Sequence, residues 1–249
     1  MELLMMVDAA RGASAAQVTV VMPHYAYARS DKKDAPRISI GGRLVADLIH
    51  TAGAHRVLTM ALHAQQVHGF FSMPVDHLTA LPVLAEHFRN RDLSNTVIVS
   101  PDFGNAKEAN QFARMLGVGM AAGSKRRLED DRVAIDSIVG KIGGKDVIIL
   151  DDEIATAGSV VELISTVRGY NVKSISVACT HGLFSGKAVE RLNAVPDITE
   201  IVATNTVPGP EGLERLTTVS VAPLFAEAVR RINCGESVSG LFSNEVTYG

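Results

Sequence analysis

Two adjacent carboxylates, Asp151 and Asp152, directly follow an apolar run at 147–150. Such a run is typical of a strand buried in a parallel sheet. Parallel sheets bind ligands at the carboxyl ends of their strands. We therefore expect both carboxylates to lie beside a ligand, where they can accept hydrogen bonds from sugar hydroxyls or orient a metal ion. The alternative is that they merely end a strand.

A turn of small residues follows the carboxylates and opens a predicted helix; its members are Thr156, Ala157, Gly158 and Ser159. A helix N-terminus offers free N–H groups and the positive end of a dipole to a phosphate. Thr156 and Ser159 add hydroxyl donors, and Gly158 removes a Cβ that would block close approach of a ligand. The segment has no Lys, which excludes a Walker A loop. We expect it to bind a phosphate monoester, although Thr156 would also serve as a simple helix cap.

Further chemically capable residues stand near other predicted strands or in charged loops. They are His63, Asp102, the pair Lys125 and Arg127, and the loop residues Arg29, Asp31 and Lys32. Each has a simpler explanation as a packed histidine, a helix-capping aspartate or a solvated charge. The order of these segments along the chain is therefore more informative than any one of them.

Strand-like and helical runs alternate along the chain. Strands are expected at 17–22, 56–62, 96–100, 147–150, 174–179 and 201–204, and helices at 38–52, 78–90, 105–116, 159–169 and 221–232. This alternation predicts an α/β fold in which helices cover parallel sheets. Gly53, Gly117 and Gly169 fall where these helices would end.

The stretch from Pro74 to Pro82 is the candidate domain boundary. It predicts an incomplete N-terminal domain at 1–76, a second domain at 77–232 and a C-terminal tail at 233–249. The first domain is called incomplete because residues 1–11 already fit an amphipathic helix and only two clear strands precede Pro74.

Composition restricts the classes of partner. The 249 residues, 47% of them hydrophobic, are enough for two modest domains, and the net charge of −3 gives no broad attraction for nucleic acid or an anionic membrane. No apolar stretch approaches the ~18 residues of a membrane span. Cys179 and Cys234 have no neighbours at metal-binding or redox spacing, which favours a reducing cytoplasm.

Taken together, these segments resemble the ribose-phosphate diphosphokinases, also called phosphoribosyl pyrophosphate synthetases. The run beginning at Asp151 resembles the phosphoribosyl diphosphate loop, which type I phosphoribosyltransferases share. The segments 27–39, 57–71, 97–107 and 121–129 resemble the diphosphokinases alone. The resemblance implies two type I phosphoribosyltransferase-like, Rossmann-like domains, with the family's N-terminal part expected to be missing from the first.

The same resemblance implies a reaction and a role for each residue. The 1-hydroxyl of ribose 5-phosphate would attack the β-phosphorus of Mg-ATP and expel AMP. The implied roles are ATP binding for Arg29, Asp31, Lys32 and His63, Mg²⁺ coordination for His63 and Asp102, stabilisation of the transferring group by Lys125 and Arg127, and ribose 5-phosphate binding by Asp151, Asp152, Thr156, Ala157, Gly158 and Ser159. A cytoplasmic homo-oligomer, commonly a hexamer, is also implied, with neither nucleic acid nor membrane as partner.

Three positions depart from the family pattern, and they keep other functions open. Ser30 replaces a usual Gln, Ala61 an acidic residue and Ala155 an Asp that contacts the sugar. A non-catalytic homologue that binds sugar phosphate or regulates an active partner would explain these changes. A phosphoribosyltransferase would share the Asp151 loop but not the earlier segments, and a purely structural protein would leave all of the motifs unexplained.

Overall fold

The computed structural model describes residues 1–127 and 133–242, and only the backbone for 125–127, 133–136 and 242. The chain divides into two compact units, Met1–Thr79 and Ala80–Gly249, which we call the N-terminal and C-terminal units. We propose that these units correspond to the two predicted domains. Each unit is considered by itself below.

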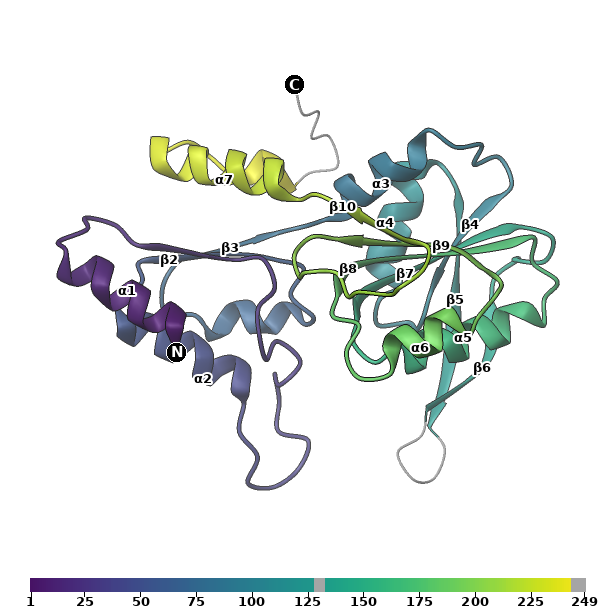
Figure 1. Cartoon of the computed structure of the whole chain (residues 1–249), viewed down its shortest axis with the longest axis horizontal. Helices are drawn as coiled ribbons and strands as arrows, with labels where there is room; N and C mark the ends of the chain where they lie inside the picture. Colours follow the sequence, from purple (N-terminus) through teal and green to yellow (C-terminus); the bar gives the residue numbers. More distant parts are fainter. Residues whose placement is uncertain (128–132, 243–249) are drawn as a thin grey trace. The chain divides into compact units, whose positions relative to one another are not determined.

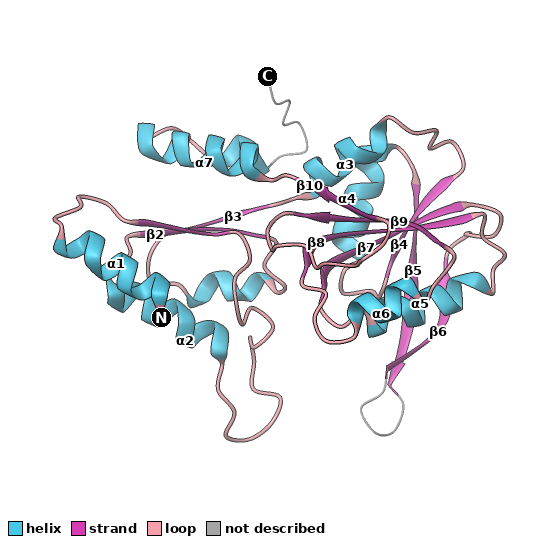
Figure 2. Cartoon of the chain, viewed as in Figure 1, coloured by secondary structure: helices cyan, strands magenta, loops and turns pink. Residues whose placement is uncertain are grey.

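The N-terminal unit is a parallel three-stranded sheet with helices packed on it. Its elements are α1 (Glu2–Gly12), β1 (Thr19–Met22), α2 (Gly41–Ala52), β2 (Arg56–Met60), the 3₁₀ helix η1 (Gln65–Phe70) and β3 (Val75–Leu78), with the strands in the order β1-β2-β3. One core joins Val7 of α1, Val20 of β1 and Ile49 of α2; Figure 2 shows these helices and strands by type. The third strand, β3, was not predicted from the sequence.

The C-terminal unit contains a seven-stranded sheet in the order β10-β9-β8-β7-β4-β5-β6 (Figure 1). Its strands are β4 (Thr96–Ser100), β5 (Gly119–Arg127), β6 (Val133–Val139), β7 (Asp146–Ile154), β8 (Ser174–Gly182), β9 (Ile198–Thr204) and β10 (Leu216–Val219). Its helices are α3 (Leu81–Arg89), α4 (Ala106–Leu116), α5 (Gly158–Arg168), α6 (Ala188–Asn193), α7 (Ala222–Cys234) and the 3₁₀ helix η2 (Ser239–Phe242). The predicted α/β architecture with parallel sheets is confirmed, with one correction, because β6 pairs antiparallel with β5.

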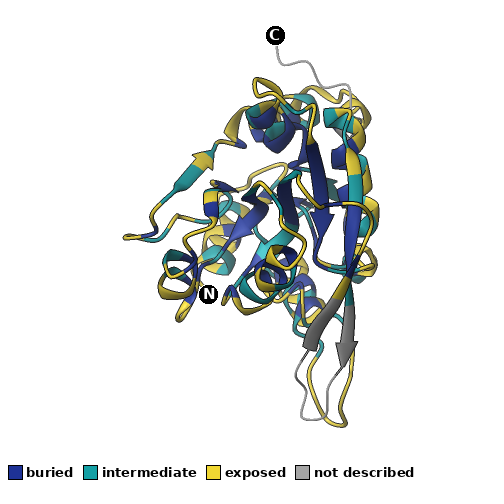
Figure 3. Ribbon diagram, turned by 90° about the vertical axis from the view of Figure 1, so that its right-hand side faces the viewer, coloured by how far each residue is buried: buried dark blue, intermediate teal, exposed yellow. Residues whose placement is uncertain are grey.

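The core of the C-terminal unit lies along its central strands, which are dark blue for much of their length in Figure 3. Helices α3 and α4 cover one face of the sheet and α5 and α6 the other (Figure 1). The apolar run before the carboxylates is buried as expected, since Ile149 and Leu150 are at most 1% exposed. This burial on both faces explains why the run lacks the apolar-polar alternation of a half-exposed strand.

Glycines end three of the helices as predicted, but they do so in two conformations. Gly53 and Gly117 are left-handed, with φ of 107° and 69°, which favours glycine. Gly169 is right-handed, with φ of −60°, a conformation open to any residue. Separately, none of the helices in the described part of the chain is both long and apolar enough to cross a membrane.

Candidate functional site

Asp151 and Asp152 lie at the carboxyl edge of the C-terminal sheet, and both are half-buried. The strand that carries them is longer than the predicted 147–150, because β7 stays paired with β8 as far as Ile154. Both carboxylates are therefore held on a rigid strand and not on a loop. The N–H of Asp152 donates to Oδ1 of Asp151 at 3.0 Å, which fixes the orientation of one carboxylate.

Asp102 stands beside them, in the loop that follows the neighbouring strand β4. Its Oδ1 accepts a hydrogen bond from the N–H of Asn105 at 3.0 Å, so Asp102 also braces the turn into α4. The side-chain amide of Asn105 donates to the carbonyl of Leu150 at 3.1 Å. Through Asn105, the loop of Asp102 is tied to the strand end that carries Asp151.

The small-residue turn has the conformation needed to begin a helix abruptly. Ala157 is left-handed, with φ of 60°, and α5 starts at the next residue, Gly158. The first N–H groups of a helix have no partner within it. Thr156 and Ser159 are exposed on either side of Ala157, which is itself buried. The N-cap of α5 is Ala157, which makes no side-chain cap, so Thr156 does not occupy the capping position.

The carbonyl groups of the turn are bound by the segment that follows β8. The N–H groups of Phe184 and Ser185 donate to the carbonyls of Ile154 and Ala155 at 3.0 and 2.8 Å. The guanidinium of Arg191, on α6, donates to the carbonyl of Thr156 at 2.8 Å. In a trans peptide the C=O and the next N–H point in opposite directions. With their carbonyls fixed on one side, these peptides direct their N–H groups to the other, an arrangement that could bind an anion.

Neither packing nor backbone strain requires a glycine at position 158. A Cβ built there would lie 3.6 Å from Nη1 of Arg191 and 3.9 Å from Oγ1 of Thr156, both ordinary contacts. Gly158 is also not among the residues with positive φ. The space over Gly158 is therefore open to a bound molecule.

A buried histidine not among the predicted site residues lies at the same edge of the sheet. His181, near the end of β8, is 3% exposed, and its Nδ1 is 2.9 Å from the hydroxyl of Thr206. The hydroxyls of Thr204 and Thr206 both donate to the carbonyl of Thr180, at 2.7 and 3.1 Å. His181 is paired in register with Glu153, two residues beyond Asp151.

The environment of these carboxylates also acts on Cys179, which is paired with Asp151 in the sheet. Burial, followed by the negative charges of Asp151, Asp152 and Glu153, raises the pKa of the thiol well above its usual value. Cys179 is therefore a protonated core residue without nucleophilic character.

In the N-terminal unit, the loop of Arg29, Asp31 and Lys32 is closed at its base by Ser30. The Ser30 hydroxyl donates to the carbonyl of Ser39 at 3.2 Å and accepts from the N–H of Gly41 at 2.9 Å. Arg29 and Lys32 are exposed. Ser30, one of the three departures from the pattern expected by resemblance, thus holds this loop together.

Asp31 connects this loop to the segment of His63. Its Oδ2 accepts a hydrogen bond from the side-chain amide of Gln66 at 2.5 Å. His63 itself is exposed. The structure therefore brings Asp31 and the His63 segment together within one unit.

The turn before His63 is hydrogen-bonded to His77 of β3. Neither this strand nor the role of His77 was predicted from the sequence. Ala61 is left-handed, with φ of 44°, and the next N–H, that of Leu62, donates to Nε2 of His77 at 2.8 Å. Nε2 is therefore an acceptor, so a neutral His77 carries its proton on Nδ1.

The remaining predicted residues can be placed only in part. Lys125 and Arg127 lie in β5, paired with Ile135 and Val133 of β6, but their side chains are outside the described part of the structure. His63 and Asp102 belong to different units. Among the described residues, no group of three or more His, Cys, Asp or Glu side chains could hold a metal ion by itself.

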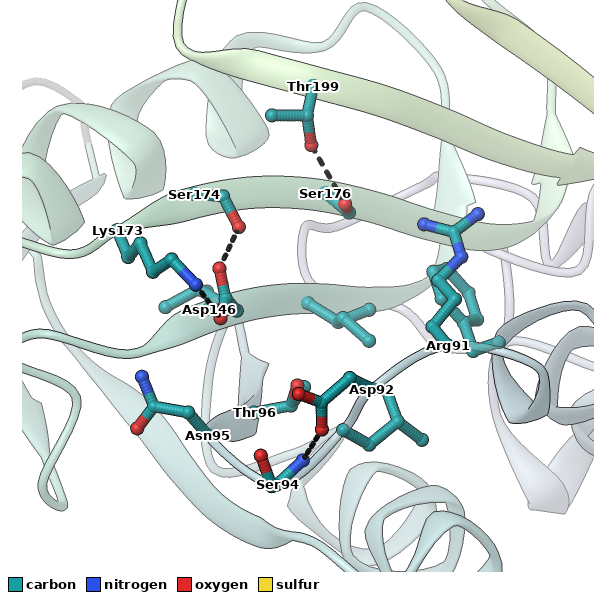
Figure 4. Close-up of a pocket in the computed structure, with 14 residues that line it drawn as sticks. Arg91, Asp92, Ser94, Asn95, Thr96, Asp146, Lys173, Ser174, Ser176 and Thr199 are labelled. Atoms are coloured by element: carbon teal, nitrogen blue, oxygen red, sulfur yellow. Dashed lines mark hydrogen bonds and ion pairs between the residues drawn. The ribbon is translucent and has the colours of Figure 1, made fainter.

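A cavity of about 390 Å³ lies at the opposite edge of the C-terminal sheet (Figure 4). Its lining includes Thr96, Asp146 and Ser174, the first residues of β4, β7 and β8. Within the lining, Asp146 accepts from Ser174 at 2.6 Å and pairs with Lys173 at 3.4 Å. Because the lining lies where these strands begin, the cavity is separate from the site at their carboxyl ends.

The sequence of this chain is similar to two protein-family models and to several known proteins. Residues 1–53 match the family model of the N-terminal domain of ribose phosphate pyrophosphokinase, and residues 134–243 match that of the phosphoribosyl synthetase-associated domain. A putative ribose-phosphate pyrophosphokinase of Streptomyces coelicolor is 63% identical over 97% of this chain and 77% of its own length. The ribose-phosphate pyrophosphokinase of Deinococcus radiodurans is 53% identical over 98% of this chain and 78% of its own.

A solved structure shows the same likeness in three dimensions. The phosphoribosylpyrophosphate synthetase of Mycobacterium smegmatis superposes with a TM-score of 0.86 at 37% identity, covering 94% of this chain and 78% of that one. With such identity over more than three quarters of its relatives' length, the chain belongs to the ribose-phosphate pyrophosphokinase family.

Proposed function

We propose that this protein transfers the diphosphoryl group of Mg-ATP to the 1-hydroxyl of ribose 5-phosphate, giving 5-phosphoribosyl 1-diphosphate and AMP. The oxygen of the 1-hydroxyl bonds to the β-phosphorus of ATP, the bond from that phosphorus to the α,β-bridging oxygen breaks, and the hydroxyl proton leaves to solvent. The relatives' names describe this activity, and their identity to this chain supports it.

One observation in the structure carries the proposal for the sugar phosphate. Strand β7 carries Asp151 and Asp152 near its carboxyl end and leads within a few residues into a turn whose carbonyls accept hydrogen bonds and after which a helix begins at Gly158. The turn suits the 5-phosphate, because oriented N–H groups and a helix N-terminus favour a dianion. The carboxylates suit the ribose hydroxyls, which donate hydrogen bonds to them.

Asp102 suits Mg²⁺ as one protein ligand. A carboxylate has about four lone-pair sites, so one that accepts a hydrogen bond, as Asp102 does from Asn105, can still coordinate a metal ion. Mg²⁺ prefers hard oxygen ligands and keeps several waters, so one or two protein ligands suffice when the ion is also bound by substrate phosphates. The ion would neutralise charge on the diphosphoryl group as it transfers.

In the N-terminal unit we assign Arg29, Asp31, Lys32 and His63 to ATP. The Asp31–Gln66 hydrogen bond supports this assignment, because it holds the charged loop beside the His63 segment. Lys125 and Arg127 keep the proposed task of stabilising the transferring group, for which cationic clamps are the usual device. Assembly into a homo-oligomer stays a prediction, which light scattering can test. Location in the cytoplasm stays a prediction as well.

The test is the release of AMP by this chain from ATP with Mg²⁺, with and without ribose 5-phosphate. Asp152→Asn removes a carboxylate from the proposed sugar site, and Asp197→Asn, an exposed carboxylate paired with Arg168, is the matched control. We expect AMP only with the sugar. Asp152→Asn should lower kcat/KM for ribose 5-phosphate roughly 10- to 100-fold, as for the loss of a hydrogen bond to a charged group, while the control stays within about twofold.

Calorimetry on the same samples separates the alternatives. Binding of ribose 5-phosphate without AMP release would refute catalysis by this chain and favour the non-catalytic homologue. Formation of a nucleotide from 5-phosphoribosyl 1-diphosphate and a free base would favour a phosphoribosyltransferase.

A further inference from the structure

We propose that Arg191 is a positioning residue of the phosphate turn, and that it also supplies positive charge to the 5-phosphate bound there. The inference rests on the proposed function. It assigns a role to a helix, α6, that the sequence did not predict and to a residue about thirty positions after the turn.

The contact of Arg191 is specific to the turn. Its Nη1 donates to the carbonyl of Thr156 at 2.8 Å and lies 3.6 Å from the point where a Cβ on Gly158 would be. The Thr156 peptide is the last before the left-handed Ala157, so its orientation decides the direction of the next N–H. Without the guanidinium this peptide is free to rotate, and the N–H need not face the phosphate.

The helix that carries Arg191 is itself anchored. The guanidinium of Arg215, in the loop before β10, donates to the carbonyls of Val195 and Ile198 at 3.0 and 2.7 Å, and more weakly to those of Leu192 and Asn193 at 3.4 and 3.3 Å. The last two belong to the final turn of α6. Arg191 therefore approaches the phosphate turn from a fixed support.

Charge is the second part of the role. A guanidinium is always protonated and has five N–H donors, and the hydrogen bond from Arg191 to Thr156 uses Nη1 alone. A phosphate held over Gly158 would be close to this cation. The charge would favour the dianion of a phosphate monoester over a neutral or singly charged group of similar size.

The test compares Arg191→Gln and Arg191→Lys with Arg168→Gln. Arg168 is exposed like Arg191, but it pairs with Asp197 and lies at the far end of α5 from the turn. For Arg191→Gln we expect KM for ribose 5-phosphate to rise roughly 5- to 30-fold, the effect of losing a partly exposed hydrogen bond to a charged donor. KM for ATP, kcat at saturating sugar and the thermal midpoint should stay near the wild-type values. Arg191→Lys should fall between Gln and wild type, because it keeps the charge on a different geometry.

The outcomes separate this role from the proposed function. A KM for ribose 5-phosphate equal to wild type in Arg191→Gln would overturn the role of Arg191 while the function stands. Equal increases in both KM values, or a fall in the thermal midpoint with kcat, would show a merely structural residue and also overturn it. Failure of the wild-type protein to bind ribose 5-phosphate in calorimetry would overturn the function and this role together.

Discussion

Replacing Gly158 by Ala should weaken ribose 5-phosphate binding without loss of stability. The added Cβ meets Arg191 and Thr156 at ordinary contact distances and imposes no positive φ. Alanine in place of glycine at the first residue of α5 should raise the free energy of unfolding by up to about 1 kcal/mol, a rise in thermal midpoint of roughly 2–4 °C. The same methyl group occupies the space over the turn, so a phosphate there must shift by about 1 Å, which can cost about 100-fold in rate.

The assay is the initial rate of AMP release with ribose 5-phosphate varied at saturating Mg-ATP, paired with thermal unfolding. Gly119→Ala is the control, because a Cβ at Gly119 has no heavy atom within 4 Å and the residue lies away from the turn. We expect kcat/KM for the sugar to fall roughly 100-fold in Gly158→Ala only, with KM for ATP within about twofold. Unchanged sugar kinetics would refute the placement of the phosphate. A lowered thermal midpoint would refute the claim that nothing in the protein requires this glycine.

Three further predictions concern stability and reactivity. Arg215→Ala should lower the free energy of unfolding by about 2 kcal/mol, through loss of its two shortest hydrogen bonds, seen as a thermal midpoint roughly 4–8 °C lower; Arg215→Gly should lose less, because φ at this position is 61°. In the folded protein a thiol reagent should modify the exposed Cys234 but not the buried Cys179, and both after unfolding; modification of Cys179 under native conditions would contradict its burial. Burial raises the pKa of Glu200, but hydrogen bonds from Arg91 and Thr217 outweigh it and lower that pKa. The ionised Glu200 therefore stabilises the fold above its unfolded-state pKa of about 4.3, and this stabilisation is lost as the pH falls further. Below that pH, the free energy of unfolding should decrease more steeply with falling pH in wild type than in Glu200→Gln.

Much of the fold could be predicted because its signals are local. An apolar run ending in carboxylates marks β7, and the helices of 105–116 and 221–232 are found within one or two residues of their expected bounds as α4 and α7. Glycine near the end of a helical pattern also located the ends of α2 and α4. These features depend on side-chain periodicity and on the backbone freedom of single residues, which a sequence displays directly.

The missed elements depend on contacts between distant residues. Strand β3 has four residues, of which Asp76 and His77 are polar, and its register is set by pairing with β2. Helix α6 has six residues, too short to show a helical pattern. Arg191 was therefore indistinguishable from an ordinary surface arginine, since its partner lies 35 residues earlier in the chain.

The three departures from the family pattern are compatible with the fold for different reasons. The Ser30 hydroxyl closes its loop through hydrogen bonds to the backbone of Ser39 and Gly41. Ala155 contributes its carbonyl to the turn through Ser185, a contact that any residue makes. Ala61 is left-handed, a conformation that Asp or Asn adopts more easily than Ala, so here the replacement costs stability as well as a carboxylate. At Ser30 and Ala155 the loop and the turn keep their hydrogen bonds, so we expect any effect of Ala155 on the reaction to come from the absence of the carboxylate that the resemblance implies there.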